Sequence, residues 1–100
     1  MTELTSRQRA LLRSIAQAAK AVLQIGKDGV TDSVVSSVQA ALNNRELLKV
    51  RVLDTAPADA RDLGDELASR IENAHLVQVI GHTIVLYRRH PEKPTIQLPG

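Results

Sequence analysis

Four consecutive residues, Gly26-Lys27-Asp28-Gly29, have the composition of a loop that could hold a phosphate group. Glycine adopts positive φ angles readily, and successive amides in such a loop can form an anion-binding nest. The loop leads into a predicted helix, whose unpaired amides and dipole favour an anion at its N-terminus. Lys27 adds a cation. These features support one of two interpretations of the loop, in which it contacts a phosphate group.

The other reading is a tight turn between a strand and a helix, because G-x-x-G alone is not specific. The stretch does not match G-x-x-x-x-G-K-[ST], so it does not predict binding of a nucleoside triphosphate. Asp28 and Asp32 oppose phosphate binding, because each repels an anion and can compete for the same amides. Asp28 could instead accept hydrogen bonds that stabilise the loop.

Further basic residues could extend a phosphate contact beyond the loop, namely Lys20, Lys49, Arg51, Arg88 and Arg89. Lys49 and Arg51 share one face of a predicted strand, since side chains alternate along a strand. Any single one of these cations is most simply a solubilising charge, but together they could follow a phosphate backbone. Tyr87, the only aromatic residue, could stack on a base, although burial in the sheet is the favoured role.

The chain shows no enzyme or metal signature. His75, His82 and His90 lack metal-ligand spacing and there is no cysteine, so we expect neither a metal site nor a cofactor. The serines lie in no nucleophile motif, and no acidic pair is placed for acid–base work. We therefore expect a protein that is not an enzyme and has no small-molecule substrate.

Length and composition predict one domain over residues 1–100, with residues 90–100 as an extended C-terminal tail. No apolar run approaches the roughly 20 residues of a membrane span, and the N-terminus lacks the features of a signal peptide, so we expect a soluble, cytoplasmic protein without a membrane partner. Residues 54–72 hold six acidic residues and two arginines, a net charge of −4, which leaves +6 on the rest. The basic remainder could bind a polyanion, and the acidic segment could bind a basic protein.

Local signals predict the order of the elements. Thr5 and Gln8 have the spacing of a capping box before a helix over residues 6–19, and a strand follows over 21–25. Thr31 is a favourable N-cap for a helix over 32–43. Alternation predicts a strand over 48–52, and Pro57 can occupy the first turn of a third helix.

Two β-rich runs, 76–80 and 83–88, flank Gly81-His82, which suits a type II′ hairpin turn. The strand–helix–strand units favour parallel neighbours with right-handed crossovers, and the hairpin is antiparallel. The sequence therefore predicts an α/β sandwich in the order helix-strand-helix-strand-helix-strand-strand. We expect a mixed sheet of about four strands with the helices on one face, and the spacing beside Gly64 predicts close packing there.

Several stretches resemble one family in the same order along nearly the whole chain: LTSRQRALLRSIA, VLQIGKDGVTDSVVSSVQAAL, ELLKVRV and VQVIGHTIVLYRR followed by PTIQLP. The chain is similar to the YhbY-type ribosome-assembly RNA-binding proteins, the stand-alone bacterial form of the CRM domain. The combination of the G-x-x-G loop with the final hairpin carries the resemblance.

The resemblance implies a small KH-like sandwich with the G-x-x-G loop between the first strand and the second helix. It also implies binding to structured RNA, typically ribosomal RNA in precursors of the large subunit. Carried onto this sequence, the RNA-binding residues are Gly26, Lys27, Asp28 and Gly29 in the loop and Arg88 and Arg89 at the end of the hairpin. The alternative function is a protein-interaction module that uses the acidic face of the third helix to bind a basic partner.

Overall fold

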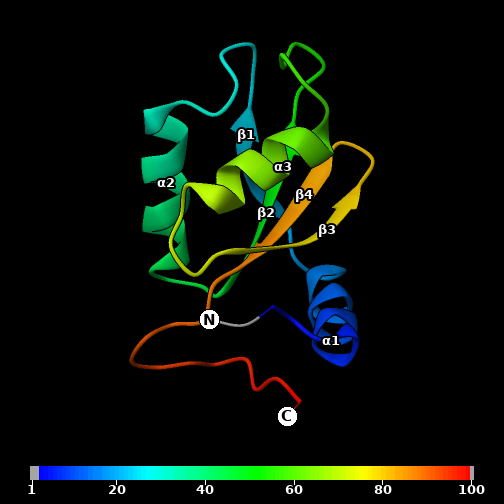
Figure 1. The fold of residues 1–100 in the computed structure, drawn as a ribbon, viewed down its shortest axis with the longest axis vertical. Coiled ribbons are helices and arrows are strands. Elements are labelled where there is room, and N and C mark those ends of the chain that lie inside the picture. Colours follow the sequence, from blue (N-terminus) through cyan, green and yellow to red (C-terminus); the bar gives the residue numbers. More distant parts are fainter. Residues whose placement is uncertain (1–2, 100) are drawn as a thin grey trace.

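A computed structural model describes residues 3–99, and Figure 1 shows the arrangement of its elements. The order of three helices and four strands agrees with the predicted order. The elements are α1 (Ser6–Ala16), β1 (Ala21–Ile25), α2 (Asp32–Leu42), β2 (Leu47–Val52), α3 (Ala60–Ser69), β3 (His75–Ile80) and β4 (Thr83–Tyr87).

The four strands form one mixed sheet in the order β1-β2-β4-β3. β1 runs parallel to β2, and β4 runs antiparallel to both of its neighbours, β2 and β3. The parallel pair is joined through α2, and β3 and β4 are joined by the two-residue turn at Gly81-His82. The prediction of a mixed α/β sheet is confirmed.

Side-chain caps fix where the helices begin. Thr5 and Gln8 form the predicted capping box, each side chain bonding the backbone amide of the other residue. The Thr31 hydroxyl accepts from the Val34 amide at the start of α2.

The placement of Pro57 in the first turn of α3 was wrong. The cap is Asp59, whose carboxylate accepts from the Asp62 amide at 2.8 Å, so the helix starts after Pro57.

The first helix is shorter than predicted and ends at Ala16 instead of residue 19. The amides of Ala18 and Ala19 bond carbonyls only three residues back, at 3.3 and 3.1 Å. These tighter turns reverse the chain so that β1 can begin at Ala21. Helical periodicity alone does not reveal this reversal, because alanine is equally compatible with both turns.

The helices do not lie on one face of the sheet, and that prediction was wrong. α2 and α3 cover one face, where Leu48, Val50 and Ile84 from the strands lie in their shared core. α1 packs on the other face, where Leu12 and Tyr87 belong to a second core. Since neighbouring residues of a strand point to opposite faces, the two cores lie on opposite sides of the sheet.

Gly64 of α3 packs directly against side chains of the sheet. A Cβ atom at this position would meet Leu76 Cδ1 at 3.0 Å and Ile84 Cγ2 at 3.3 Å. Both atoms belong to side chains of the core between α3 and the sheet. The predicted close packing at Gly64 is confirmed, and it outweighs the cost of about 1 kcal/mol for glycine in a helix.

The segment from His90 to Pro99 is held against the second core by Glu46. This carboxylate is 3% exposed and accepts hydrogen bonds from the amides of His90, Thr95 and Ile96 and from the Thr95 hydroxyl, at 2.7–2.9 Å. Burial alone would raise the pKa of Glu46, but the four hydrogen bonds hold it below its ordinary value. Ile96 and Leu98 are thereby placed against the α1 side of the sheet.

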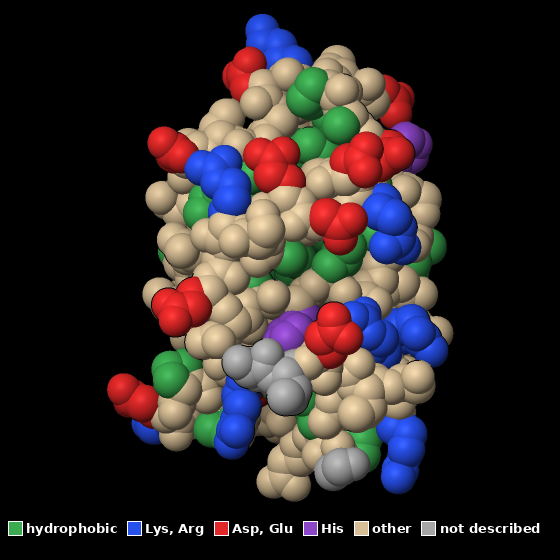
Figure 2. All heavy atoms as spheres, viewed as in Figure 1, with side chains coloured by type: hydrophobic (Ala, Val, Ile, Leu, Met, Phe, Trp, Pro, Cys, Tyr) green, Lys and Arg blue, Asp and Glu red, His purple; other side chains and the backbone are tan. Residues whose placement is uncertain are grey.

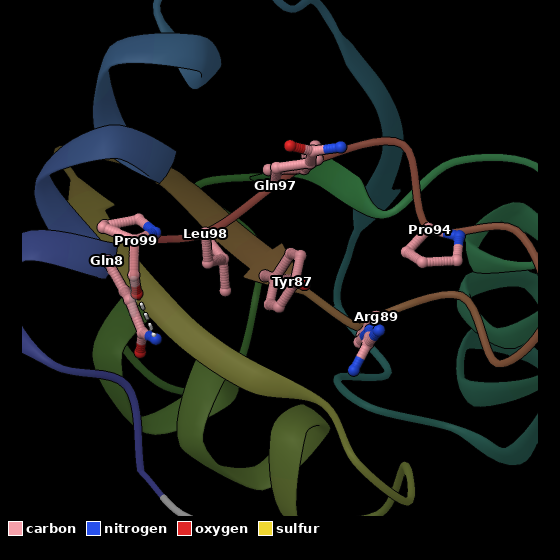
Figure 3. Close-up of a pocket in the computed structure, with 8 residues that line it drawn as sticks. Gln8, Tyr87, Arg89, Pro94, Gln97, Leu98 and Pro99 are labelled. Atoms are coloured by element: carbon pink, nitrogen blue, oxygen red, sulfur yellow. Dashed lines mark hydrogen bonds between the residues drawn. The ribbon is translucent and has the colours of Figure 1, made fainter.

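Figure 3 shows a hollow between this segment and the sheet, with a volume of about 490 Å³. Tyr87 lies at its base, Arg89 and Pro94 lie toward one end, and Gln8 donates to the Pro99 carbonyl at the other. The hollow is open to solvent and lies at the α1 end of the molecule.

Candidate nucleic-acid interface

The G-x-x-G stretch forms a tight turn between β1 and α2. The Gly29 amide donates to the Gly26 carbonyl at 3.0 Å, which closes the turn. Gly29 has a φ of 69°, and a Cβ atom there would lie 3.0 Å from Pro57 Cγ, so both backbone angle and space favour glycine. Gly26 does not have a positive φ. Of the two glycines of the turn, only Gly29 uses the freedom of glycine to adopt a positive φ.

The amides of Lys27 and Asp28 at the tip of the turn have no hydrogen-bond partner within residues 3–99. Both residues are exposed. The Gly29 amide is used to close the turn, and the Val34 amide is used by the Thr31 cap. The donors left for a ligand are thus at the tip of the turn and in the first turn of α2.

The two carboxylates near this turn differ in their surroundings. Asp32, in the first turn of α2, forms an ion pair with Arg70 at the end of α3. Arg70 also donates to the Val30 carbonyl at 2.7 Å, which fixes its guanidinium beside the loop. Asp28 accepts no hydrogen bond from any residue that the structure describes. The expected repulsion from Asp32 is therefore weakened by Arg70, and Asp28 does not stabilise the loop by hydrogen bonding.

Arg51 lies next to the loop, because it is the direct partner of Gln24 in the β1–β2 pair. Lys49 lies two residues earlier on the same face of β2 and donates from Nζ to the Ala19 carbonyl at 3.1 Å. Lys20 follows Ala19 at the start of β1. Lys49 and Arg51 thus lie on one side of the sheet, running away from the loop, and Lys20 is next in sequence to the Ala19 carbonyl that Lys49 bonds.

Arg88 and Arg89 follow the C-terminal end of β4, at the opposite end of the molecule from the loop. Figure 1 shows the loop at the top, beside the loop that joins β2 to α3, and the end of β4 near the tail at the bottom. Arg88 donates to Asn43 Oδ1 at 2.8 Å at the C-terminal end of α2. The nine predicted site residues therefore fall into two groups, with Arg88 and Arg89 separated from the rest.

Tyr87 does not offer a stacking surface. Its side chain is 1% exposed, and its ring stacks on His75 with a centroid distance of 6.4 Å. Burial raises the pKa of Tyr87, and the negative charge of Glu46 adds to this effect. The expectation that Tyr87 is buried in the sheet is confirmed.

Charge is divided between the two sides of the sheet. Figure 2, which views the side of α2 and α3, shows acidic side chains spread over α3. The helix and its cap contribute Asp59, Asp62, Asp65 and Glu66 to that surface. The four strands contain no acidic residue, and Lys49 and Arg51 project to the opposite side.

Sequence reasoning missed two polar residues that shape this molecule, Arg70 and Glu46. Arg70 is 38 residues from its partner Asp32, and no local pattern links them. Glu46 had a weak local signal, because it directly precedes two buried leucines at the start of β2.

Within residues 3–99, no helix is long and apolar enough to cross a membrane, and no three potential metal ligands cluster.

Comparison with known proteins identifies the family of this chain. The model of the CRS1/YhbY (CRM) domain matches residues 4–88. The chain therefore belongs to the CRS1/YhbY (CRM) domain family.

Individual relatives cover nearly the whole chain. The Bacillus subtilis protein named "Probable RNA-binding protein YqeI" is 41% identical over 96 residues, which span 96% of this chain and 99% of the relative. A Haemophilus influenzae protein named "RNA-binding protein" is 37% identical over 99 residues, or 99% of this chain and 98% of the relative. The solution structure of a hypothetical Staphylococcus aureus protein matches with a TM-score of 0.81 and 40% identity, covering 97% of this chain and all of that one.

Proposed function

We propose that this chain is a non-enzymatic, cytoplasmic RNA-binding domain that binds ribosomal RNA during assembly of the large ribosomal subunit. Its family membership and the names of its relatives support RNA as the partner. The assignment to large-subunit RNA extends the resemblance of the sequence to ribosome-assembly proteins. The proposal includes no cofactor, no membrane and no small-molecule substrate.

The observation that carries the proposal is the pair of unused amides at the tip of the G-x-x-G turn. The amides of Lys27 and Asp28 are exposed and unbonded within the described residues, and the turn leads directly into α2. A backbone phosphate could accept from these amides while the helix dipole and the Lys27 ammonium favour its charge. The ion pair of Arg70 with Asp32 reduces the opposing charge at the start of the helix.

Cations on the sheet would extend this contact along the RNA. Lys49 and Arg51 lie on one side of the sheet with Arg51 nearer the loop, and Lys20 directly precedes β1. Most of the affinity would then be electrostatic, independent of sequence and sensitive to salt. Arg88 and Arg89 would contact a second part of the same RNA at the far end of the domain, whose longest extent is 39 Å.

The experiment is a salt titration of binding to large-subunit ribosomal RNA by the wild type and by Lys27→Ala. Loss of one phosphate contact should lower the affinity and reduce the slope of log K against log salt by about 0.7 to 0.9. Lys93→Ala is the matched control, because it removes the same charge from an exposed site in the tail. Equal affinity and slope for Lys27→Ala and the wild type would remove Lys27 from the mechanism.

Asp28→Lys provides a test in the opposite direction. The change removes a repulsive charge from the tip of the turn and adds an attractive one, so the affinity for the same RNA should rise. Asp28 makes no hydrogen bond with any described residue, so the fold should tolerate the change. Weaker or equal binding by the folded variant would count against a phosphate at this turn.

The second candidate function is binding of a basic protein through α3. The acidic surface formed by Asp59, Asp62, Asp65 and Glu66 supports this candidate. The acidic side chains of α3 are separate from Lys27 in the turn and from Lys49 and Arg51 on the other side of the sheet, so substitutions can separate the two functions.

A further inference from the structure

The side of the sheet that packs against α1 is covered over only part of its area. α1 and the tail cover the end that carries Leu47, Val77 and Tyr87. Figure 1 shows α1 at that end, away from the G-x-x-G loop. The part nearer the loop consists of Val22, Gln24, Arg51, Thr83 and Ile80, which we term the open sheet face.

Four residues of the open sheet face form a row across all four strands, and Val22 lies two residues before Gln24 on β1. Arg51 is the direct partner of Gln24 on one side and of Thr83 on the other, and Thr83 is the partner of Ile80. The residues next to them in sequence, Val50 and Ile84, lie in the core beneath α2 and α3. Because side chains alternate along a strand, the row projects away from that core.

The open sheet face exposes aliphatic surface that the core does not use. Val22 is 43% exposed and Ile80 is 51% exposed, and these are two of the three large hydrophobic side chains with high exposure among residues 3–99. Val22, Gln24 and Arg51 also line a shallow hollow of about 430 Å³. Val22 lies on β1 and Ile80 on β3, the two edge strands, so these aliphatic groups flank Arg51 and Thr83 from either side.

The charge of the open sheet face favours an anionic partner. Arg51 lies within it, and Lys49 lies one row further from the loop on the same side. None of the four strands contains an acidic residue, whereas the acidic side chains of α3 lie on the other side of the sheet. Gln24 adds an amide, which can both donate and accept hydrogen bonds.

We propose that the open sheet face binds unpaired nucleotides of the RNA whose backbone is held at the G-x-x-G turn, an inference that rests on the proposed function. Bases pack on Val22 and Ile80, the Gln24 amide bonds a base edge, and Arg51 contacts a phosphate. A four-stranded sheet has room for about two or three bases. Gln24 is two residues before the turn, so a strand of RNA can pass from one surface to the other without a gap.

Unpaired RNA fits this surface better than a duplex. Bases in an A-form duplex are stacked and paired, and its deep major groove does not admit side chains, so a nearly flat face with aliphatic groups reaches bases only where they are unpaired. The absence of exposed aromatic side chains on the open sheet face predicts a weaker contribution per base than the roughly 1 to 3 kcal/mol of aromatic stacking.

The test compares two RNAs, a paired hairpin and the same hairpin with a short single-stranded extension. The wild type should bind the extended RNA about fivefold more tightly, which corresponds to about 1 kcal/mol. The double variant Val22→Ser/Ile80→Ser should lose this preference while keeping its affinity for the paired hairpin. Ile15→Ser is the matched control, because Ile15 is an exposed aliphatic side chain of α1 outside this face.

Arg51→Gln should weaken binding to the extended RNA and lower its salt slope, whereas Arg61→Gln on α3 should change neither. Circular dichroism and thermal unfolding establish that each variant is folded. If the wild type binds neither RNA, the proposed function itself fails. If Lys27→Ala weakens binding but the double variant keeps the wild-type preference for the extended RNA, the inference about the open sheet face is overturned and the proposed function stands.

Two other occupants of this face are also tested. Binding of polyglutamate that Arg51→Gln abolishes, with RNA binding unchanged, would assign the face to an acidic protein and overturn the inference. If sedimentation shows a dimer that Ile80→Ser abolishes, again with unchanged RNA binding, the open sheet face is the contact with a second copy of the chain. This result would also overturn the inference.

Discussion

Arg70 at the end of α3 forms an ion pair with Asp32 in the first turn of α2. The same guanidinium donates to the Val30 carbonyl at 2.7 Å, so one side chain ties the two helices together beside the G-x-x-G turn. The charge of the carboxylate in the first turn of α2 is therefore partly offset by a residue from a distant part of the chain. This relationship accounts for how a phosphate could approach α2 despite Asp32.

The first prediction concerns Arg70→Met, which keeps the aliphatic part of the side chain but removes its contacts with Asp32, Val30 and Glu66. We expect the free energy of unfolding to fall by about 1 to 2 kcal/mol, because a buried carbonyl loses a charged donor. RNA affinity should also fall, since Asp32 is then unpaired. Urea unfolding and a binding titration measure the two effects.

Asp32→Asn is the control for Arg70→Met, because it removes the ion pair but leaves the hydrogen bond to Val30. Its cost should be at most about 1 kcal/mol, as for an exposed ion pair and a helix-dipole contact. An equal loss of stability in both variants would show that the hydrogen bond to Val30 contributes nothing.

The second prediction compares alanine at the two glycines of the turn. Gly29→Ala should cost about 1 to 2 kcal/mol of unfolding free energy, because alanine is strained at positive φ and its Cβ would crowd Pro57. Gly26→Ala should be nearly neutral, since its Cβ would meet Leu53 only at an ordinary 3.8 Å. Thermal and urea unfolding of both variants measure the difference. Equal costs would contradict the geometry assigned to this turn.

The third prediction concerns Glu46→Gln and pH. The pKa of Glu46 is lowered in the folded protein, so its ionisation stabilises the fold above the ordinary value of 4.5. This contribution is lost as pH falls below 4.5 and through the lowered pKa of the folded state. The side-chain NH₂ of glutamine is a donor and would face the backbone amides that donate to Glu46. The free energy of unfolding of the variant should therefore fall by about 1 to 3 kcal/mol at neutral pH.

Urea unfolding of the wild type and of Glu46→Gln between about pH 7 and pH 3 measures this dependence, and the difference between them should shrink as pH falls. The comparison cancels the titration of the other carboxylates, which the two proteins share. A difference that stays constant across this range would show that the charge of Glu46 does not hold the tail.

Much of the fold follows from local signals, but the side of the sheet that α1 covers does not. The caps at Thr5 and Thr31 and the alternation in β2 are local, and they predicted those elements closely. The right-handed crossover rule constrains α2, which joins two parallel strands. α1 precedes the first strand, so no crossover rule applies to it. Its amphipathic pattern shows that one side of the helix is buried, but not which face of the sheet that side packs against.

The candidate site was predictable in part for the same reason. The G-x-x-G turn is a contiguous stretch, and the shared face of Lys49 and Arg51 follows from strand periodicity. The distance of Arg88 and Arg89 from the loop depends on the direction of β4, and the pairing of Arg70 with Asp32 depends on how α3 crosses the sheet. Such relationships exist only in the assembled fold.

The fourth prediction separates the two candidate functions by reversing charge on α3. Asp62→Lys with Asp65→Lys should leave RNA binding intact or slightly stronger, because the substitutions lie on the side of the sheet opposite Arg51. Binding of a basic protein partner through α3 should be abolished. Asp62 lies in the first turn of α3, so a small loss of stability, about 0.3 to 1 kcal/mol, is expected and is checked by thermal unfolding. Loss of RNA binding in the folded variant would contradict the arrangement proposed here.

The most direct test of the central claim is ultraviolet crosslinking of the protein to RNA in growing cells, followed by mapping of the crosslinked nucleotides and peptides. We expect large-subunit ribosomal RNA as the main crosslinked species, with crosslinks in the peptide that contains Gly26 to Gly29 and loss of these crosslinks in Lys27→Ala. Crosslinks confined to other RNAs, or to peptides of α3 with none at the G-x-x-G turn, would contradict it.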